Sequence, residues 1–225
     1  MLIVEKKPKS MISENYRTLR TNIRYSSFDK KMQTILITST VPSEGKSTTA
    51  CNLAMSMSEI YEKVLIIDCD LRKPTIHKKF NISNTYGLSN YLQEEADFDS
   101  MINHYSKNLY VLSSGRNVPN PSEMLSSKRF KEFLNRVRNE FDVIVIDSPP
   151  VLSVSDAQVL GSMVDGVIFV IGSCQTEAEL CKKAKVMLEK VNANIIGAVL
   201  TKTKVKSKKN YGYQYYYNSA LAGEK

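Results

Sequence analysis

The chain has 225 residues, of which 42% are hydrophobic and 24% charged, a composition typical of folded globular proteins that excludes disordered, collagen-like and disulfide-scaffold chains. At about 150 residues for a typical domain, this length predicts one large domain. The longest apolar run is five residues, at 167–171, whereas a membrane-spanning helix needs roughly 18 or more. Residues 1–4 are followed at once by charged residues, unlike a signal peptide, so we expect a cytoplasmic chain that does not itself cross a bilayer.

The net charge of +8 is concentrated at one end of the chain. Residues 201–225 contain six lysines and one glutamate, a balance of +5 that leaves +3 for the other 200 residues. Nucleic-acid-binding proteins usually carry their basic residues on a face of the folded body, so this distribution argues against nucleic acid as a partner. We also expect buried, reduced thiols and no zinc site, because no CxxC pair occurs among Cys51, Cys69, Cys174 and Cys181.

Taken in chain order, the predicted elements begin with a helix and continue as alternating strands and helices. In the first helix, Ile12, Tyr16, Leu19 and Ile23 share one apolar stripe. The predicted strands are residues 34–38, 64–68, 109–112, 143–147, 167–171 and 195–200. The main predicted helices between them are residues 47–61, 128–140 and 177–191. Because the strands are apolar nearly throughout, we predict an α/β fold with a mostly parallel sheet covered by helices on both faces.

A phosphate-binding sequence directly follows the first predicted strand. Residues 40–48, TVPSEGKST, lead from a strand into a helix, which is the context that a P-loop requires. In such a loop Lys46 would reach the β and γ phosphates of ATP and the Ser47 hydroxyl would ligate Mg²⁺. Since Thr40 and Ser43 replace glycines common in P-loops, a simple turn is the alternative. The predicted nucleotide-binding residues are Ser43, Glu44, Gly45, Lys46, Ser47 and Thr48.

Aspartates follow two further predicted strands. Asp68 and Asp70 lie at the end of one, and Asp147 lies at the end of another. The carboxyl ends of strands are where open α/β folds bind ligands, so these carboxylates should converge on the phosphates. A single aspartate at a strand end often only caps a turn, but three beside a P-loop predict a P-loop NTPase site.

Together these motifs resemble the bacterial tyrosine kinases that regulate capsule and exopolysaccharide synthesis, in the split form whose membrane activator is a separate chain. The likeness covers nearly the whole chain, through the P-loop at 42–48, a second Walker-type motif at 64–74, a Walker B strand at 143–150 and a terminal tyrosine cluster. Thr201 stands where relatives often have an asparagine near adenine. The E-x-x-R-x-x-R spacing of three further residues looks like the family's subunit-contact motif: Glu14, Arg17 and Arg20.

The resemblance implies an ATP-dependent protein-tyrosine kinase in three parts. These are an oligomerisation helix at 1–30, a P-loop kinase domain at 31–203 and a Lys/Tyr-rich tail at 204–225. The implied catalytic residues are Lys46, Asp68, Asp70 and Asp147, and the implied Mg²⁺ ligands are Ser47, Asp70 and Asp147. Either Asp68 or Asp70 would orient or deprotonate the substrate tyrosine, and the sequence does not divide these roles.

The tail tyrosines are the substrates that the resemblance implies, phosphorylated between subunits of a homo-oligomeric ring, octameric in the family. The implied sites are Tyr211, Tyr213, Tyr215, Tyr216 and Tyr217. The implied partners are a membrane activator that recruits the chain to the inner face of the cell membrane, a protein-tyrosine phosphatase, and sugar-nucleotide enzymes as further substrates. From the residues alone, the tyrosines beside lysines also fit an aromatic patch for a partner or a membrane, and Glu14 and Arg17 fit an ordinary intrahelical pair.

The competing interpretation is a partitioning or division ATPase, which acts as a nucleotide switch without kinase activity. Those proteins place a second, signature lysine near the start of the P-loop, where this chain has Val41. As a rule they also lack a tyrosine-rich tail. The sequence therefore favours the kinase.

Overall fold

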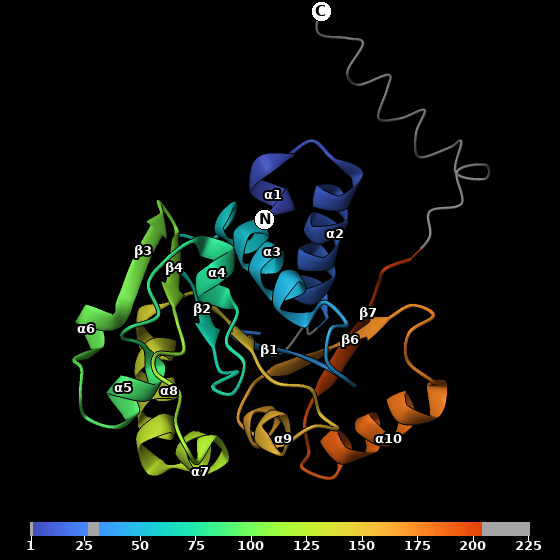
Figure 1. Cartoon of the computed structure of the whole chain (residues 1–225). Coiled ribbons are helices and arrows are strands. Elements are labelled where there is room, and N and C mark those ends of the chain that lie inside the picture. The colour runs from blue at the N-terminus through green and yellow to red at the C-terminus, as the bar shows by residue number, and fades with distance from the viewer. Residues whose placement is uncertain (1, 27–31, 204–225) are drawn as a thin grey trace, which may run out of the picture.

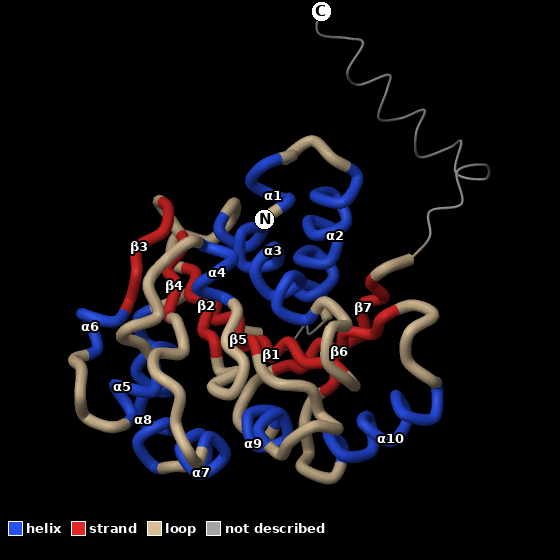
Figure 2. The backbone as a smooth tube through the Cα atoms, in the orientation of Figure 1, coloured by secondary structure: helices blue, strands red, loops and turns tan. Residues whose placement is uncertain are grey.

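The computed structural model describes residues 2–26 and 32–203, whose centre is a twisted sheet (Figures 1 and 2). In the described part the sheet has seven strands in the order β3-β4-β2-β5-β1-β6-β7. Every neighbouring pair is parallel except the antiparallel β3 and β4. The strands are β1 Thr34–Ser39, β2 Val64–Asp68, β3 Ile102–Ser106, β4 Leu109–Leu112, β5 Val143–Asp147, β6 Gly166–Gly172 and β7 Ile195–Thr201.

Helices cover both faces of this sheet, which confirms the predicted α/β architecture (Figure 1). One apolar core lies under α3 and the N-terminal helices, and a second lies under α8, α9 and α10. The central strands β1, β2 and β5 are buried along their whole length, as expected for strands covered on both sides. The helices are α1 Ile3–Lys6, α2 Met11–Tyr25, α3 Lys46–Ser58, α4 Ile76–Phe80, α5 Leu88–Leu92, α6 Phe98–Met101, α7 Pro121–Ser126, α8 Lys128–Glu140, α9 Asp156–Gly161 and α10 Ala178–Glu189.

The six predicted strands are confirmed to within one residue at each end, but the edge strand β3 was missed. Its sequence, INHYS, carries polar residues and lies half-buried, and its pairing with β4 is irregular between His104 and Ser106. It therefore has neither the apolar run of the central strands nor a clean alternation. The short helices were missed because four to six residues span too little of the helical period to show a stripe.

The N-terminal helix α2 packs against α3, as Figure 1 shows. It begins after Ser10, whose side chain accepts a hydrogen bond from the Ser13 backbone N–H, an ordinary N-cap. Ile23 is buried, but Ile12 is 54% exposed, so the predicted apolar stripe is shorter than expected. Between α1 and α3, the Asn52 side chain accepts hydrogen bonds from the backbone of the first turn.

The cysteines divide into two groups, which corrects the expectation that all are buried. Cys51 and Cys69 are buried, and burial raises the pKa of both thiols well above its ordinary value. Cys174 is exposed and Cys181 is half-buried. Among the described helices, none is long and apolar enough to cross a bilayer.

Candidate active site

The P-loop between β1 and α3 turns through two left-handed residues. Ser43 has a φ of 68° and Gly45 a φ of 97°, a region that residues with a Cβ rarely adopt. Gly45 is the N-cap of α3, so the backbone N–H groups that follow it open the helix without intrahelical partners. An N-terminus of this kind attracts anions, and the loop is shaped to receive a phosphate.

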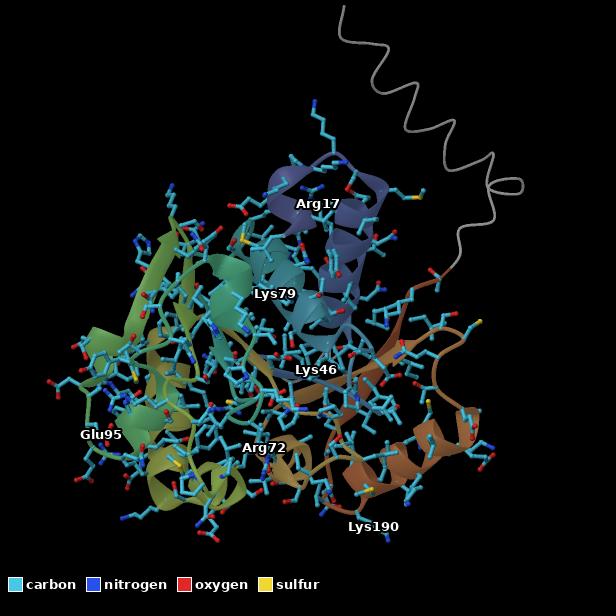
Figure 3. The ribbon with its side chains drawn as sticks, in the orientation of Figure 1. Arg17, Lys46, Arg72, Lys79, Glu95 and Lys190 are labelled. Atoms are coloured by element: carbon cyan, nitrogen blue, oxygen red, sulfur yellow. The ribbon has the colours of Figure 1, made fainter. Side chains whose placement is uncertain are left out.

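Lys46 is the cation at the centre of this site (Figure 3). Its Nζ lies 2.9 Å from Asp70 Oδ2, 3.6 Å from Asp147 Oδ1 and 3.2 Å from Ser47 Oγ. Burial alone would lower the pKa of Lys46, but Asp147 and Asp70 together outweigh burial and raise it. The structure thus brings together four of the predicted residues: Ser47, Asp70, which follows β2, and Asp147, at the end of β5, lie around the ammonium group of Lys46.

Asp147 is a fully buried carboxylate at the end of β5, and neither of its oxygens accepts a hydrogen bond from the described residues. Burial raises its pKa, and the nearby Lys46 opposes that rise. Buried carboxylates usually accept hydrogen bonds or bind a metal ion. The two Asp147 oxygens, which lie beside Ser47 and accept no hydrogen bond within the described part of the chain, are therefore suited to bind a cation.

The donor set also suits Mg²⁺. Within residues 2–26 and 32–203, no group of three or more His, Cys, Asp and Glu side chains is arranged to hold a metal. Mg²⁺ usually keeps several waters and binds through one or two carboxylates together with substrate phosphates. The hydroxyl of Ser47 and the carboxylates of Asp70 and Asp147 therefore fit this ion when a nucleotide supplies the phosphates.

Asp68 and Asp70 occupy different positions, although the sequence grouped them. The Asp68 carboxylate accepts backbone hydrogen bonds from Asp70, Thr75 and Ile76 at 3.0–3.1 Å, so it shapes the loop that follows β2. Burial, followed by the negative charge of Asp147, raises the pKa of Asp68 to about 8. Asp70 instead points at the P-loop lysine.

Glu44, predicted to bind nucleotide, directs its side chain away from the mouth of the loop. Its carboxylate is buried and accepts hydrogen bonds from the Val41 N–H and the Gly172 N–H, both at 2.9 Å, and from the Thr176 hydroxyl. Thr201, at the end of β7, donates from its hydroxyl to the Glu44 carbonyl. Only the backbone of Glu44 is thus placed to face a phosphate.

Comparison with known proteins identifies the family. An AAA domain model matches residues 32–196. The chain is 44% identical to the tyrosine-protein kinase YwqD of Bacillus subtilis, over 94% of this chain and 90% of that protein. It is 41% identical to the putative tyrosine-protein kinase CapB of Staphylococcus aureus, over 96% and 94% of the two chains. The chain belongs to the bacterial tyrosine-protein kinases. The crystal structure of the chimerical protein CapA2B2 supports this, with a TM-score of 0.85 at 39% identity and 88% of both chains covered.

These relatives confirm the predicted enzyme class, and they do not favour the ATPase switch. The P-loop fold indicates that the kinase binds a nucleotide. The tyrosine cluster from Tyr211 to Tyr217 and the rest of the predicted tail lie outside the described residues.

Two basic residues that follow β2 were not predicted as site residues. Arg72 binds the buried carboxylate of Asp156 through two hydrogen bonds of 3.0 and 3.2 Å. Lys79, on α4, donates to the hydroxyl of Thr48 at 2.9 Å. Figure 3 shows Lys79 near α3 and Arg72 near α9. The sequence could have pointed to both residues, because Arg72 lies within the second Walker-type motif at 64–74 and Lys79 follows it closely.

The predicted subunit-contact residues of the kinase find partners within the same chain. Arg17 Nη2 lies 2.7 Å from Glu59 Oε1, and Arg20 Nη1 lies 2.7 Å from Glu59 Oε2. Hydrogen bonds from Arg17 lower the pKa of Glu59 despite its partial burial. Glu14 also pairs with Arg17, at 3.3 Å, as an intrahelical neighbour. The two arginines therefore tie α2 to the end of α3.

Proposed function

We propose that this kinase transfers the γ-phosphoryl group of ATP to tyrosines of the C-terminal cluster on a neighbouring subunit, and so regulates capsular or exopolysaccharide synthesis. The observation that carries the proposal is the buried arrangement of Lys46 between Asp70 and Asp147 at the N-terminus of α3. Phosphoryl transfer depends mainly on positioning and on stabilising charge, which fixed cations and helix amides supply. The 41–44% identity to named tyrosine kinases supports the tyrosine acceptor.

In the proposed step, the tyrosine oxygen forms a bond to the γ-phosphorus while the bond from that phosphorus to ADP breaks. A tyrosine hydroxyl has an ordinary pKa near ~10, so a carboxylate must accept its proton. We assign this task to Asp70, because its carboxylate points at the P-loop lysine and accepts only one backbone hydrogen bond among the described residues, from Lys73. The Asp68 carboxylate instead accepts three backbone hydrogen bonds from the loop after β2. Asp68 acts by holding the loop that presents Asp70.

Lys46 and the backbone amides at the start of α3 stabilise the negative charge on the transferring phosphoryl group. A bound Mg²⁺ would add positive charge at the phosphate oxygens, held by Ser47, Asp70 and Asp147. The low exposure of Lys46 and Asp70 keeps water away, which strengthens these electrostatic interactions.

The tail is proposed as substrate on sequence grounds. The tyrosine cluster begins at Tyr211, only ten positions after the last residue of β7. Transfer between subunits would need a homo-oligomer, for which we propose the ring implied by the family. We further propose a membrane activator that recruits the kinase to the inner face of the cell membrane, a phosphatase that reverses the modification, and sugar-nucleotide enzymes as external substrates.

A mixing experiment tests both the tyrosine acceptor and the transfer between subunits. Chains that carry Lys46→Met and an intact tail are combined with active chains whose five tail tyrosines are Phe, in Mg²⁺-ATP with and without a candidate activator. We expect mass spectrometry to find phosphotyrosine on the tails of the Lys46→Met chains. Hydrolysis of ATP without phosphotyrosine in the wild type would instead support the nucleotide switch.

A further inference from the structure

The end of β7 is bonded directly to the P-loop. The Thr201 hydroxyl donates to the Glu44 carbonyl at 2.5 Å, and the ammonium group of Lys202 donates to the Ser43 carbonyl at 2.7 Å. Thr201 also lies so close to Gly45 that a Cβ at the glycine position would stand 3.4 Å from the threonine methyl group. Two consecutive residues therefore hold two consecutive carbonyls of the loop.

Lys202 joins three segments at this point. Besides the Ser43 carbonyl, its Nζ donates to Gln175 Oε1 at 2.6 Å, in the loop that leads from β6 to α10. The Ser173 N–H donates to the Thr201 carbonyl at 2.9 Å, which fixes the same loop to β7. Lys202 forms no ion pair with a carboxylate of the described residues, so its contacts with Ser43 and Gln175 are the ones that define its position.

The loop needs such support from outside. Ser43 keeps a left-handed backbone without being glycine, a conformation that persists only when its surroundings impose it. Glu44 supplies part of that restraint through its buried carboxylate. Lys202 acts on the carbonyl of the strained residue itself, and its own φ of 55° is left-handed too.

We propose that Lys202 is a positioning residue for nucleotide binding: it holds the Ser43 carbonyl, and with it the P-loop, in the conformation that receives the phosphates. The inference rests on the proposed use of ATP. Lys202 touches no reacting atom, so its loss weakens nucleotide binding and leaves the rate of phosphoryl transfer at saturating ATP unchanged.

The test measures binding of Mg²⁺-ADP to the full-length chain by calorimetry, which requires no phosphoryl transfer. Lys202→Met keeps most of the side-chain length and removes the donor, whereas Lys202→Arg restores a donor. Lys190→Met is the matched control, because Lys190 is an exposed lysine at the far end of α10 (Figure 3). We expect Lys202→Met to weaken ADP binding about 3- to 10-fold, the effect of losing one hydrogen bond of ordinary strength.

Lys202→Arg should recover most of the affinity, and Lys190→Met should match the wild type. In kinase assays the KM for ATP should rise for Lys202→Met with kcat unchanged. The inference is overturned if Lys202→Met binds ADP as the wild type does, or if its affinity and its melting temperature fall together. If wild-type protein binds ADP but phosphorylates no tyrosine, the proposed function fails while this test of Lys202 still gives its own answer.

Discussion

The two charged clusters of this kinase both pair basic with acidic side chains but differ in their access to water. In the active site, the side chains of Lys46, Asp70 and Asp147 are 10%, 6% and 0% exposed. In the cluster between α2 and α3, Arg17, Arg20 and Glu59 are 24%, 13% and 33% exposed. Because the active site is buried, its charges interact strongly with one another, whereas solvent screens the interactions in the second cluster.

The clusters also differ in how well their charges are matched. In the active site Lys46 pairs with Asp70 and Asp147, a third carboxylate, Asp68, adds negative charge nearby, and the pKa values of Asp68 and Asp147 are raised. At the helix interface the arginines lower the pKa of Glu59, so that pairing favours the folded state. The contrast indicates that the active-site carboxylates are electrostatically strained in the ligand-free protein. In the second cluster, the charge of Glu59 is stabilised by arginines of the same chain.

The largest expected effect comes from Lys46→Met, which removes the cation from the strained cluster. We expect tyrosine phosphorylation to fall by roughly 10²–10³-fold or more, as when a charge-stabilising group is lost from an active site. The chain should still fold, because the buried carboxylates can take up protons. Phosphotyrosine assays and circular dichroism check the two parts. Full phosphotransfer by this variant, beside an active wild type, would remove the P-loop lysine from the mechanism.

The next effect separates activity from stability at Asp147. Asp147→Asn removes a buried charge and its 3.6 Å ion pair with Lys46, but Lys46 keeps its closer partner Asp70, and no hydrogen bond among the described residues is broken. We expect phosphorylation to be lost and the ligand-free protein to become more stable at neutral pH by about 1–3 kcal/mol. Urea unfolding measures the change. A destabilised Asp147→Asn variant would show that the site is not strained.

The pH dependence follows from the same carboxylates. Asp68 has a pKa of about 8 when folded against an ordinary value of 3.8, so between these values the folded protein binds the extra proton. Stability from this group is therefore highest at acid pH and falls as the pH rises towards 8. Because Asp147 contributes to the raised pKa of Asp68, Asp147→Asn should flatten this decline in melting temperature.

The half-buried carboxylate of Asp165 provides the control of opposite sign. Although burial opposes it, hydrogen bonds from Arg138 and Thr34 lower the pKa of Asp165. Its contribution is present above the ordinary pKa and is lost as the pH falls through the lowered one. Asp165→Asn should therefore destabilise the protein at neutral pH, by roughly 1–2 kcal/mol, as measured by urea unfolding.

The sequence predicted the buried cluster better than the surface one. Lys46, Ser47, Asp70 and Asp147 could be placed together because P-loop spacing and strand ends are determined by a parallel sheet. The separate positions of Asp68 and Asp70 could not, because they depend on which backbone N–H groups the following loop turns towards a carboxylate. No local pattern carries that information.

The role of Glu59 was also beyond the sequence, for a different reason. It lies 42 positions from Arg17, and the two meet only because α2 packs on α3. The same holds for Lys202, which lies 159 positions from Ser43. The sequence predicts which strand ends meet at one edge of a parallel sheet, whereas side-chain contacts that depend on how a helix or a distant strand packs follow from the whole fold.

The smallest expected effect concerns the surface cluster, and it tests whether the arginines act within a chain or between chains. Combined Glu14→Ala, Arg17→Ala and Arg20→Ala substitutions and the single Glu59→Ala substitution both remove the pairing between α2 and α3. Each should cost about 0.5–1 kcal/mol of stability, as is usual for partly exposed ion pairs, and the cost should shrink at high salt. Thermal unfolding at two salt concentrations checks this.

The two variants diverge if the arginines also reach a neighbouring subunit. Glu59→Ala leaves both arginines in place, with their hydrogen bonds to the Pro8 and Ser56 carbonyls, so oligomer mass by light scattering should be retained. The triple variant removes the arginines themselves, so it should reduce both oligomer mass and labelling between mixed chains. Equal stability loss with an unchanged oligomer in both variants would restrict Arg17 and Arg20 to holding α2 on α3. A lower oligomer mass in the triple variant alone would give them both roles, because Glu59→Ala already reports the effect of losing the pairing with Glu59.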